Sequence, residues 1–510
     1  MGRLLLSLPA EVLVACFSYL VPDPSPTDYH YPFSNYSHEK RNRRALRKLC
    51  QTSKRCQEIA RPLLYHTVMI HNPRQAVALL LALLSNGMGP AIRNFACLVP
   101  MHAGHPVFGQ WIPVMETVLR AGPDARQKLD QMKLFTSTRH VQEMCATELM
   151  CRIITMCLKH MTSGKDILLR LPAIPILIFD EINLGTLTHE LVEELSVHDT
   201  WNIIRLQLLP LGSSRWRPAG WMPETSEGLA ATRVFLNPRA TRIDLCGDQG
   251  NWSDLYRSFR ARLGRGVLND NHAEARFSAC HLSRVEDLRL LQSQTNPFWI
   301  RRLLKHSPNL NHLTYTFRNG LCEDGYGSTL NNEYVTLNTA LLEGSTKLQS
   351  MHLERHLDLD NDIEPGSTHN LISCLSVFDK LKALRIDIAL LSGTGIRLTN
   401  SSSPPNLANL LPKSLEVVEF IERWHWTEHS LMTDGVLDVV EFYDNWVEQF
   451  LLGFSENCRR GVFPDVRRVT LKAYPKYECG GHLRSTAGIS ALRGTFEDLG
   501  IAFIWKCHSL

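Results

Sequence analysis

A short apolar pattern recurs along most of this sequence and constrains its fold more than any other feature. Each copy has an apolar residue, two other residues, a second apolar residue, one other residue and a third apolar residue. The copies are Ile203/Leu206/Leu208, Ala240/Ile243/Leu245, Val285/Leu288/Leu290, Leu310/Leu313/Tyr315, Leu348/Met351/Leu353, Leu381/Leu384/Ile386, Leu415/Val418/Phe420 and Val466/Val469/Leu471, with Ile92/Phe95/Cys97 as an earlier copy. Because the last two apolar positions alternate, each copy predicts a short strand.

Apolar residues at helical spacing precede several of these predicted strands. They are Trp299/Leu303/Leu304, Leu337/Leu341/Leu342, Leu371/Leu375/Phe378 and Trp446/Phe450/Leu451. The repeating unit is therefore a helix followed by a strand, which predicts an α/β fold with a parallel sheet covered by helices on one face. A curved solenoid is the simplest way to stack such units, and an irregular α/β domain is the alternative.

The end of the chain has the pattern of a cap. Leu492, Phe496 and Leu499 form a helical stripe that Gly500 can end, and residues 501–505 follow as a predicted last strand. The region 71–510 is similar to leucine-rich repeats, although successive copies lie 37, 45, 25, 38, 33, 34 and 51 residues apart. All but one of these intervals exceed the 20–29 residues of regular repeats, and the usual asparagine is missing.

The first 70 residues have a different character. Leu8, Val12, Leu13, Cys16, Phe17 and Leu20 form one stripe of a predicted helix. Residues 21–43 are interpreted as an insert, and two more short helices carry Leu46, Leu49 and Cys50, then Cys56, Ile59 and Ala60 up to Pro62. Helices this short cannot cover all of one another's apolar surface, so some remains for a partner or the following domain.

These residues resemble the F-box, in the form found in filamentous fungi. The matching segments are Leu8-Pro9-x-Glu11-Val12-Leu13-x-x-x-Phe17-x-Tyr19-Leu20, then Leu46-x-x-Leu49-Cys50-x-Thr52-Ser53-Lys54-Arg55, then Ile59-Ala60-x-Pro62-Leu63-Leu64-Tyr65. The long insert is a departure from the family. The resemblance implies a three-helix module at 1–70 that docks on a Skp-type adaptor, and through it on a cullin and a RING subunit. The residues that it assigns to docking or to bracing the module are Leu8, Pro9, Val12, Leu13, Phe17, Leu20, Leu46 and Leu49.

Charge separates the same two regions. The net charge of the chain is +4, but residues 1–75 hold eleven Lys or Arg and five acidic residues. The cationic run 40–44 is interpreted as a solvated face, with a nuclear localisation signal as the alternative and nucleic-acid binding as the least favoured reading.

The cysteines and the longest apolar run indicate the cellular compartment in which we expect the protein. The 14 cysteines form no C-x-x-C pair, which favours a reducing compartment, and the longest apolar run, 76–84, is too short to cross a bilayer. We therefore expect a cytoplasmic or nuclear protein, or one found in both places, without a membrane segment.

Motifs for catalysis and for cofactors fail on inspection. No phosphate-binding loop, G-x-G-x-x-G or G-x-S-x-G is present. His352 and His356 lie on a predicted strand, where residues four apart do not readily share a metal ion, and His425 with His429 lacks a third ligand. Loop packing is preferred over interface anchoring for Trp216, Trp221, Trp252, Trp424 and Trp426. The sequence predicts no catalytic, cofactor-binding or metal residue.

The functional prediction is a non-catalytic substrate-recognition subunit of a Skp/cullin/F-box E3 ubiquitin ligase. The first region would dock the adaptor, and the repeat region would bind a protein substrate that the sequence does not identify. The alternative is a repeat scaffold in a Skp complex that does not lead to degradation, and an unrecognised hydrolase is the least favoured hypothesis.

Overall fold

The structure is a computed structural model of the whole chain. It describes residues 8–21, 36–97, 146–172, 201–209, 237, 239–246, 281–293, 295, 297–318, 336–344, 347–356, 372–392, 404–423, 436–474 and 486–507. The described part is α/β, with twelve strands. The chain divides into two compact units, here called unit 1 (1–244 with 253–262) and unit 2 (245–252 with 263–510). The predicted domain boundary at residue 70 stays a prediction.

Unit 1 begins with three helices, α2 (Ala10–Ser18), α3 (Tyr36–Thr52) and α4 (Lys54–His66). The Ser53 side chain accepts a hydrogen bond from the Cys56 amide at 3.1 Å, which starts α4 with an N-cap. Helix α3 begins within the predicted insert 21–43, in a polar stretch that apolar spacing does not detect, and the insert itself stays a prediction. The predicted end of the next helix at Pro62 is wrong. Helix α4 continues through Pro62, since Ile59, Leu63 and Leu64 still pack on the helical core.

Four parallel strands of unit 1 follow in chain order: β1 (Thr67–Ile70), β2 (Asn94–Cys97), β3 (Asp166–Pro172) and β4 (Ile203–Leu209). Helices α5 (Pro73–Asn86) and α9 (Ala146–His160) and the 3-10 turn η1 (Gly89–Ala91) connect them. The Asn72 side chain caps α5 by accepting from the Gln75 amide, and Gly87 ends it with a φ of 57°. Strand β5 (Arg242–Cys246) crosses the boundary between the units.

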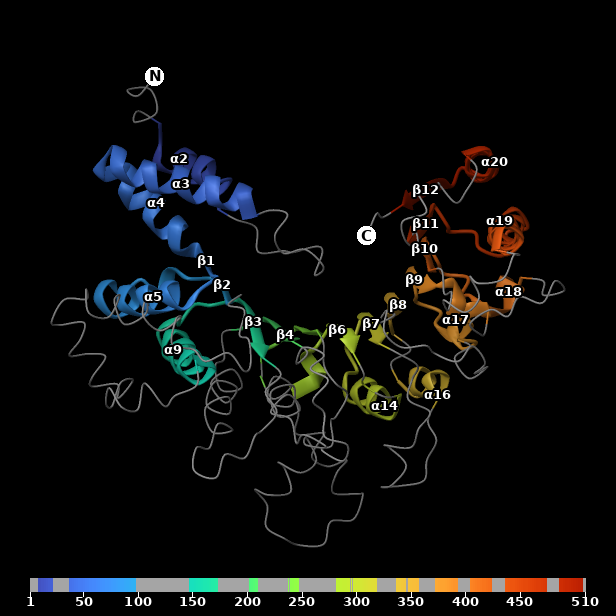
Figure 1. The fold of residues 1–510 in the computed structure, drawn as a ribbon, viewed down its shortest axis with the longest axis horizontal. Coiled ribbons are helices and arrows are strands. Elements are labelled where there is room, and N and C mark those ends of the chain that lie inside the picture. Colours follow the sequence, from blue (N-terminus) through green and yellow to red (C-terminus); the bar gives the residue numbers. More distant parts are fainter. Residues whose placement is uncertain are drawn as a thin grey trace, which may run out of the picture. The chain divides into compact units, whose positions relative to one another are not determined.

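Unit 2 repeats a helix or turn followed by a strand (Figure 1). Its strands, parallel and in chain order, are β6 (Asp287–Ser293), β7 (His312–Arg318), β8 (Ser350–His356), β9 (Ala383–Asp387), β10 (Val417–Arg423), β11 (Arg468–Tyr474) and β12 (Ala502–Cys507). The helical elements are η2 (His281–Arg284), α14 (Pro297–His306), α16 (Leu337–Leu342), η4 (Leu375–Val377), α17 (Ile388–Ser392), α18 (Leu407–Leu410), α19 (Val436–Arg459) and α20 (Thr486–Glu497). The helix predicted over 371–378 is wrong, because a single 3-10 turn stands there.

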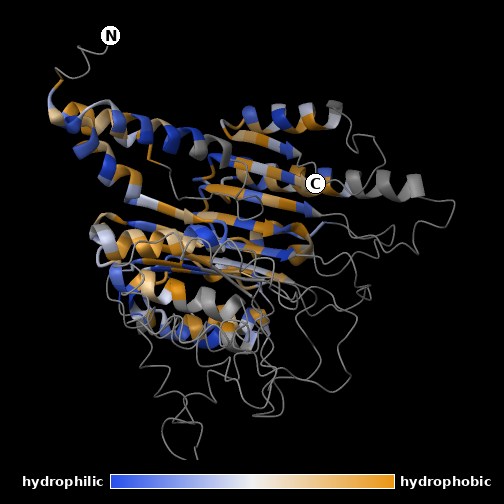
Figure 2. Ribbon diagram, turned by 60° about the vertical axis from the view of Figure 1, so that its left-hand side comes forward, coloured by the Kyte–Doolittle hydropathy of each residue, from blue (hydrophilic) through white to orange (hydrophobic). Residues whose placement is uncertain are grey.

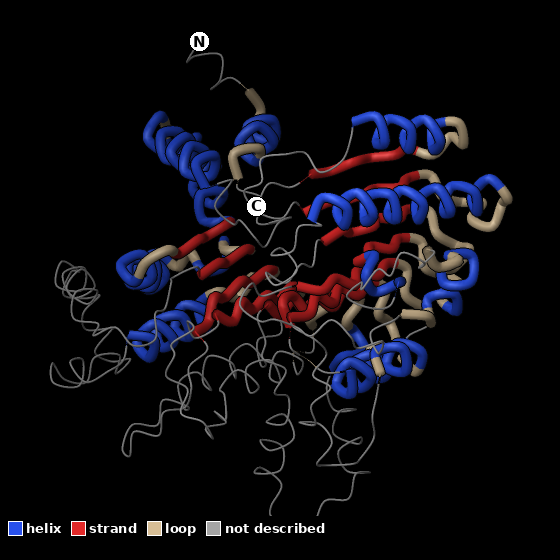
Figure 3. Tube along the Cα trace, turned by 45° about the vertical axis from the view of Figure 1, so that its right-hand side comes forward, coloured by secondary structure: helices blue, strands red, loops and turns tan. Residues whose placement is uncertain are grey.

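The strands of unit 2 have one apolar and one polar face. In register, Leu313, Met351, Leu384, Val418, Val469 and Phe503 form one buried row, and Tyr315, Leu353, Ile386, Phe420 and Leu471 form another. Helices α14 to α20 lie on one side of these strands (Figure 3), and the strands alternate in hydropathy along their length (Figure 2). The core of unit 2 therefore sits between the helices and the apolar strand face.

Side chains also tie neighbouring repeats together at the turns before the strands. The Asn338 Oδ1 accepts from the Ser373 amide at 2.9 Å, and the Asn309 Nδ2 donates to the Ser283 carbonyl at 2.7 Å. The Ser414 Oγ donates to the Leu381 carbonyl at 2.9 Å. Each bond joins a side chain of one repeat to a backbone group of a neighbouring repeat.

The predicted strands are confirmed, with one register error and two omissions. The copy assigned as Ile203/Leu206/Leu208 is shifted, because Trp201 and Ile204 are buried whereas Ile203 is only partly buried. Strand β3 was missed because Gly164 occupies the first apolar position, where the Trp201 ring leaves no space for a Cβ. Strand β1 follows the α4 helix without a loop, so its copy of the pattern was read as the end of the helical segment.

The C-terminal strand is also confirmed, as β12. Gly500 has a φ of 71° and the Ile501 amide donates to the Phe496 carbonyl at 2.9 Å, a left-handed end to the last helical turn. The aromatic rings of Phe496 and Phe503 then stack with centroids 5.3 Å apart.

Several predicted features lie outside the described residues. They include the five tryptophans Trp216, Trp221, Trp252, Trp424 and Trp426 and the His425/His429 pair. The Gly, Pro, Ser and Asn residues of the sequence also predict loops, most of which lie outside the described residues, at 100–130, 211–232, 319–334, 355–370 and 392–406.

Candidate functional site

The described part of the chain holds no cluster of metal ligands. Among them, no three His, Cys, Asp or Glu side chains lie together as a metal-binding group, and no helix has the length and hydropathy needed to cross a membrane. The helical segment and the polar faces of the strands carry the exposed apolar side chains and the ion pairs described below.

The helical segment α2–α4 has its own small core. Leu13, Phe17, Leu46, Cys56 and Ala60 are buried there, with Phe17 only 4% exposed. Leu8, Leu20 and Leu49 pack against this core while remaining partly exposed. Six of the eight predicted docking residues thus help to hold the three helices together: Leu8, Leu13, Phe17, Leu20, Leu46 and Leu49.

The remaining two predicted residues lie on the outer side of α2. Pro9 and Val12 are exposed, Val12 by 41%, and Cys16 and Tyr19 are exposed in line with them, Tyr19 by 87%. At about 100° per residue, these four positions fall within roughly 80° of one another around the helix axis. We call Pro9, Val12, Cys16 and Tyr19 the α2 ridge. It is an apolar strip that no described residue covers.

Arginine side chains fix the helices in place. The Arg55 guanidinium donates to the Leu8 carbonyl at 2.8 Å and so holds the start of α2 on α4. The Arg43 guanidinium donates to the Thr67 carbonyl at 2.8 Å and joins α3 to the first residue of β1. Arg43, a member of the cationic run 40–44, therefore has a structural contact, and this run lies within α3 rather than in a loop.

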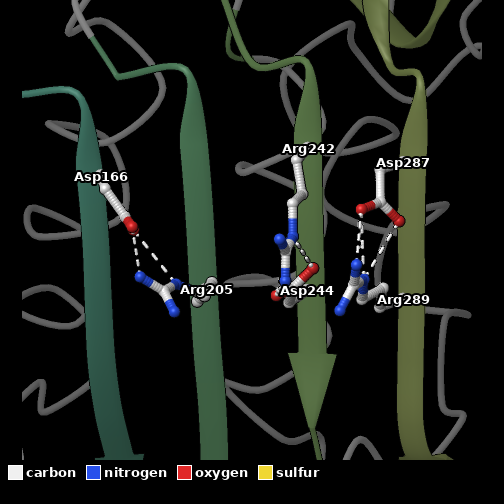
Figure 4. Close-up of polar contacts among 6 residues, drawn as sticks. All are labelled: Asp166, Arg205, Arg242, Asp244, Asp287 and Arg289. Atoms are coloured by element: carbon white, nitrogen blue, oxygen red, sulfur yellow. Dashed lines mark hydrogen bonds and ion pairs between the residues drawn. The ribbon is translucent and has the colours of Figure 1, made fainter. Parts of the chain in front are cut away.

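The polar strand face of unit 1 holds a buried ion pair (Figure 4). The Arg205 Nε on β4 donates to Asp166 Oδ1 on β3 at 3.1 Å, and its Nη2 pairs with Oδ2. The two side chains are only 5% and 11% exposed. Burial raises the pKa of Asp166, although the hydrogen bonds and charge of Arg205 act in the opposite direction. On β5, Arg242 binds Asp244 through two bonds of 2.8 and 2.9 Å.

The polar strand face of unit 2 carries a more open ionic network. Glu354 on β8, 5% exposed, contacts His352 Nε2 at 2.7 Å and Arg385 Nη2 at 3.2 Å. Arg385 on β9 also lies 3.1 Å from Glu419 on β10, and Lys506 on β12 lies 3.9 Å from Glu419. Burial lowers the pKa of His352 more than the hydrogen bond to Glu354 raises it. At the start of this face, Arg289 pairs with Asp287 along β6 (Figure 4).

The apolar pattern of the sequence does not predict these ionic networks. His352 and His356 do lie on a strand, β8, as predicted. The sequence did contain a signal for these networks. Charged residues stand between the apolar positions of the pattern, so they lie on the opposite face of each predicted strand. The pairing itself depends on the strand register, which the sequence did not supply.

The sequence was also compared with known proteins. No protein-family model matches it, and no curated protein is significantly similar to it. Functional arguments therefore rest on the residues themselves.

Proposed function

We propose that this chain is the substrate-recognition subunit of a Skp/cullin/F-box E3 ubiquitin ligase. In this proposal the helices α2–α4 act as an F-box and bind a Skp-type adaptor, while the strand-and-helix region acts as an irregular leucine-rich-repeat-like solenoid and binds the protein target. The chain performs no chemistry itself. It holds the target near the conjugating enzyme, which raises the effective concentration of the acceptor lysine.

The α2 ridge is the observation that carries this proposal. Apolar side chains such as Val12 and Tyr19 stand in water on a helix that packs on the helical core through Leu13 and Phe17. Burying one such side chain contributes roughly 1.5 to 3 kcal/mol before the costs of association are subtracted. A partner that covers the whole ridge therefore gains enough to bind stably without disturbing the helical core.

The helix supplies a matched control for this idea. Val14 is 44% exposed, close to the 41% of Val12, and it lies about 200° further around the α2 axis. The two valines thus share residue type, helix and exposure but occupy different faces. Substitution by aspartate places a charge on either face without removing a buried side chain.

The test is adaptor capture by the full chain. We expect Val12→Asp to reduce recovery of a co-expressed Skp adaptor at least tenfold, while Val14→Asp recovers as much as the unmodified chain. Equal urea midpoints would show that both variants are folded. Undiminished capture by Val12→Asp would contradict the proposal.

A second measurement separates the ligase from a scaffold in a non-degradative Skp complex. Adaptor-bound chain should also recover a cullin, and both should be lost together in Val12→Asp. Recovery of the adaptor with no cullin would favour the scaffold.

A further inference from the structure

One side of helix α3 gathers positive charge. Arg41, Arg44, Arg47 and Lys48 are exposed, and at about 100° per residue they fall within roughly 120° of one another around the helix axis. Leu46, which is buried in the helical core, lies on the opposite side of the helix. We call Arg41, Arg44, Arg47 and Lys48 the α3 cationic face.

These four charges are not compensated by neighbouring groups. None of the four side chains forms a hydrogen bond or an ion pair with a described residue. Between residues 41 and 66 the sequence holds eight Lys or Arg and a single acidic residue, Glu58 on α4. Arg44 lies one helical turn from both Arg41 and Lys48, and like charges at this spacing repel. A polyanion along this face would replace the repulsion with attraction.

The residue types on this face indicate which polyanion fits. Among the described side chains of α3, the other exposed ones are Gln51 and Thr52, so the face offers no apolar anchor. Specific protein interfaces have an apolar or aromatic core, and a helix that enters a membrane surface carries apolar residues beside its cations. Nucleic-acid interfaces are polar and strongly positive, and three of the four cations are arginines, which bind phosphate through paired hydrogen bonds. The face therefore favours a phosphate backbone.

We propose that the α3 cationic face binds the phosphate backbone of duplex DNA. The major groove of B-form DNA is about 12 Å wide and admits an α-helix, whereas the major groove of duplex RNA is deep and narrow. Cations that spread over roughly 120° of a helix reach phosphates on both walls of such a groove. The sequence favours a solvated face for the run 40–44. Folding as a helix changes this reading, because it aligns Arg47 and Lys48 with the run.

This inference goes beyond the ligase proposal, because it gives the helical segment a second partner through α3 rather than through the α2 ridge. The experiment measures DNA binding by the full chain through fluorescence anisotropy. The probe is a fluorescein-labelled DNA duplex of mixed sequence, at salt concentrations between about 50 and 200 mM. Each phosphate contact releases counterions, so four contacts predict a slope of about −3 to −4 for log K against log salt.

The test variant is Arg44→Gln with Lys48→Gln. It should reduce the magnitude of the salt slope by about 2 and weaken DNA binding by about tenfold or more, because two phosphate contacts are lost. Glutamine is a good helix former, so the urea midpoint should not fall.

The matched control is Lys413→Gln with Arg493→Gln. Both residues are exposed in unit 2 without an ion pair to a described residue, so the control loses the same net charge away from α3. It should bind the DNA duplex with the slope of the unmodified chain. Equal weakening in the control, no binding of the DNA duplex, or tighter binding of duplex RNA or poly-glutamate than of DNA would overturn the inference.

The two proposals fail separately. Val12→Asp should lose the adaptor and keep the DNA duplex, and Arg44→Gln with Lys48→Gln should do the reverse. If the unmodified chain binds the duplex through α3 but captures no adaptor, the α3 cationic face stands and the ligase function falls.

Discussion

The polar strand faces of β3–β5 and of β8–β10 occupy the same place in the repeat but differ in how far their ion pairs are exposed to water. In the first, Asp166 and Arg205 are almost completely removed from water and pair with each other. In the second, Arg385 stays one-third exposed and divides its charge between two glutamates. Removing one partner of a buried ion pair leaves an unpaired charge away from water, which destabilises the fold strongly. In a hydrated network, water can replace a lost partner, so the loss of one member destabilises the fold less.

Removing one partner of the buried pair should have the largest effect. Arg205→Met leaves Asp166 in a buried position without its guanidinium, and we expect a loss of about 3 to 5 kcal/mol in the free energy of unfolding. Urea denaturation followed by circular dichroism would measure it. Adding Asp166→Leu to Arg205→Met should restore much of the stability, since a well-packed apolar pair avoids the desolvation of both ions. If the single variant is as stable as the unmodified chain, the pair is not buried in solution.

The matching change in the open network should cost less. Arg385→Met removes the contacts to Glu354 and Glu419, but His352 still binds Glu354 and water reaches Glu419. We expect a loss of about 1 to 3 kcal/mol by the same urea measurement. A loss in the free energy of unfolding as large as that of Arg205→Met would contradict the proposed difference between the two strand faces.

The pH dependence of stability should report the half-buried histidine. Burial lowers the pKa of His352 in the folded chain, so below about pH 6.5 the unfolded chain takes up a proton at this side chain that the folded chain resists. Stability is therefore lost as pH falls through this range, and His352→Gln should lessen the loss between about pH 8 and about pH 5. Parallel pH profiles of the two proteins would show instead that folding does not lower the pKa of His352.

An exposed pair should show the smallest effect. Lys382 and Glu416 lie 2.9 Å apart, with Lys382 61% exposed, and the hydrogen bond from Lys382 lowers the pKa of Glu416. Because water screens this pair, Lys382→Met should leave the urea midpoint unchanged within error. A clear shift would mean that the open face is less hydrated than its exposure indicates.

Local pattern predicted much of the fold. The spacing of Leu381, Leu384 and Ile386 required a strand with one buried face, and the same spacing recurred often enough to predict parallel strands and their order. The pattern failed at Gly164, where the Trp201 ring fills the space that an apolar side chain at this position would occupy. It also failed in the polar first turns of α3, because apolar periodicity carries no information there.

The candidate surfaces were only partly predictable. The sequence placed Leu8 to Leu20 on one stripe but could not divide that stripe into buried and exposed sides. The structure makes the division: Leu13 and Phe17 are covered by Leu46, Cys56 and Ala60, whereas Val12 remains in water. Packing depends on residues distant in the chain, which periodicity within one helix cannot reveal.

The sequence by itself determined the repeating helix and strand, the change in character after the first 70 residues and the apolar face of each strand, because these follow from side-chain spacing within a few residues. The tertiary structure decided which charges meet. Arg385 reaches Glu354 and Glu419 only because β8, β9 and β10 adopt one register, although 31 residues separate Arg385 from Glu354 along the chain. Lys472 and Lys506 become neighbours by the same means. Strand pairing brings together groups whose separation in sequence is set by intervening helices and loops of unequal length, so no local pattern can specify their contacts.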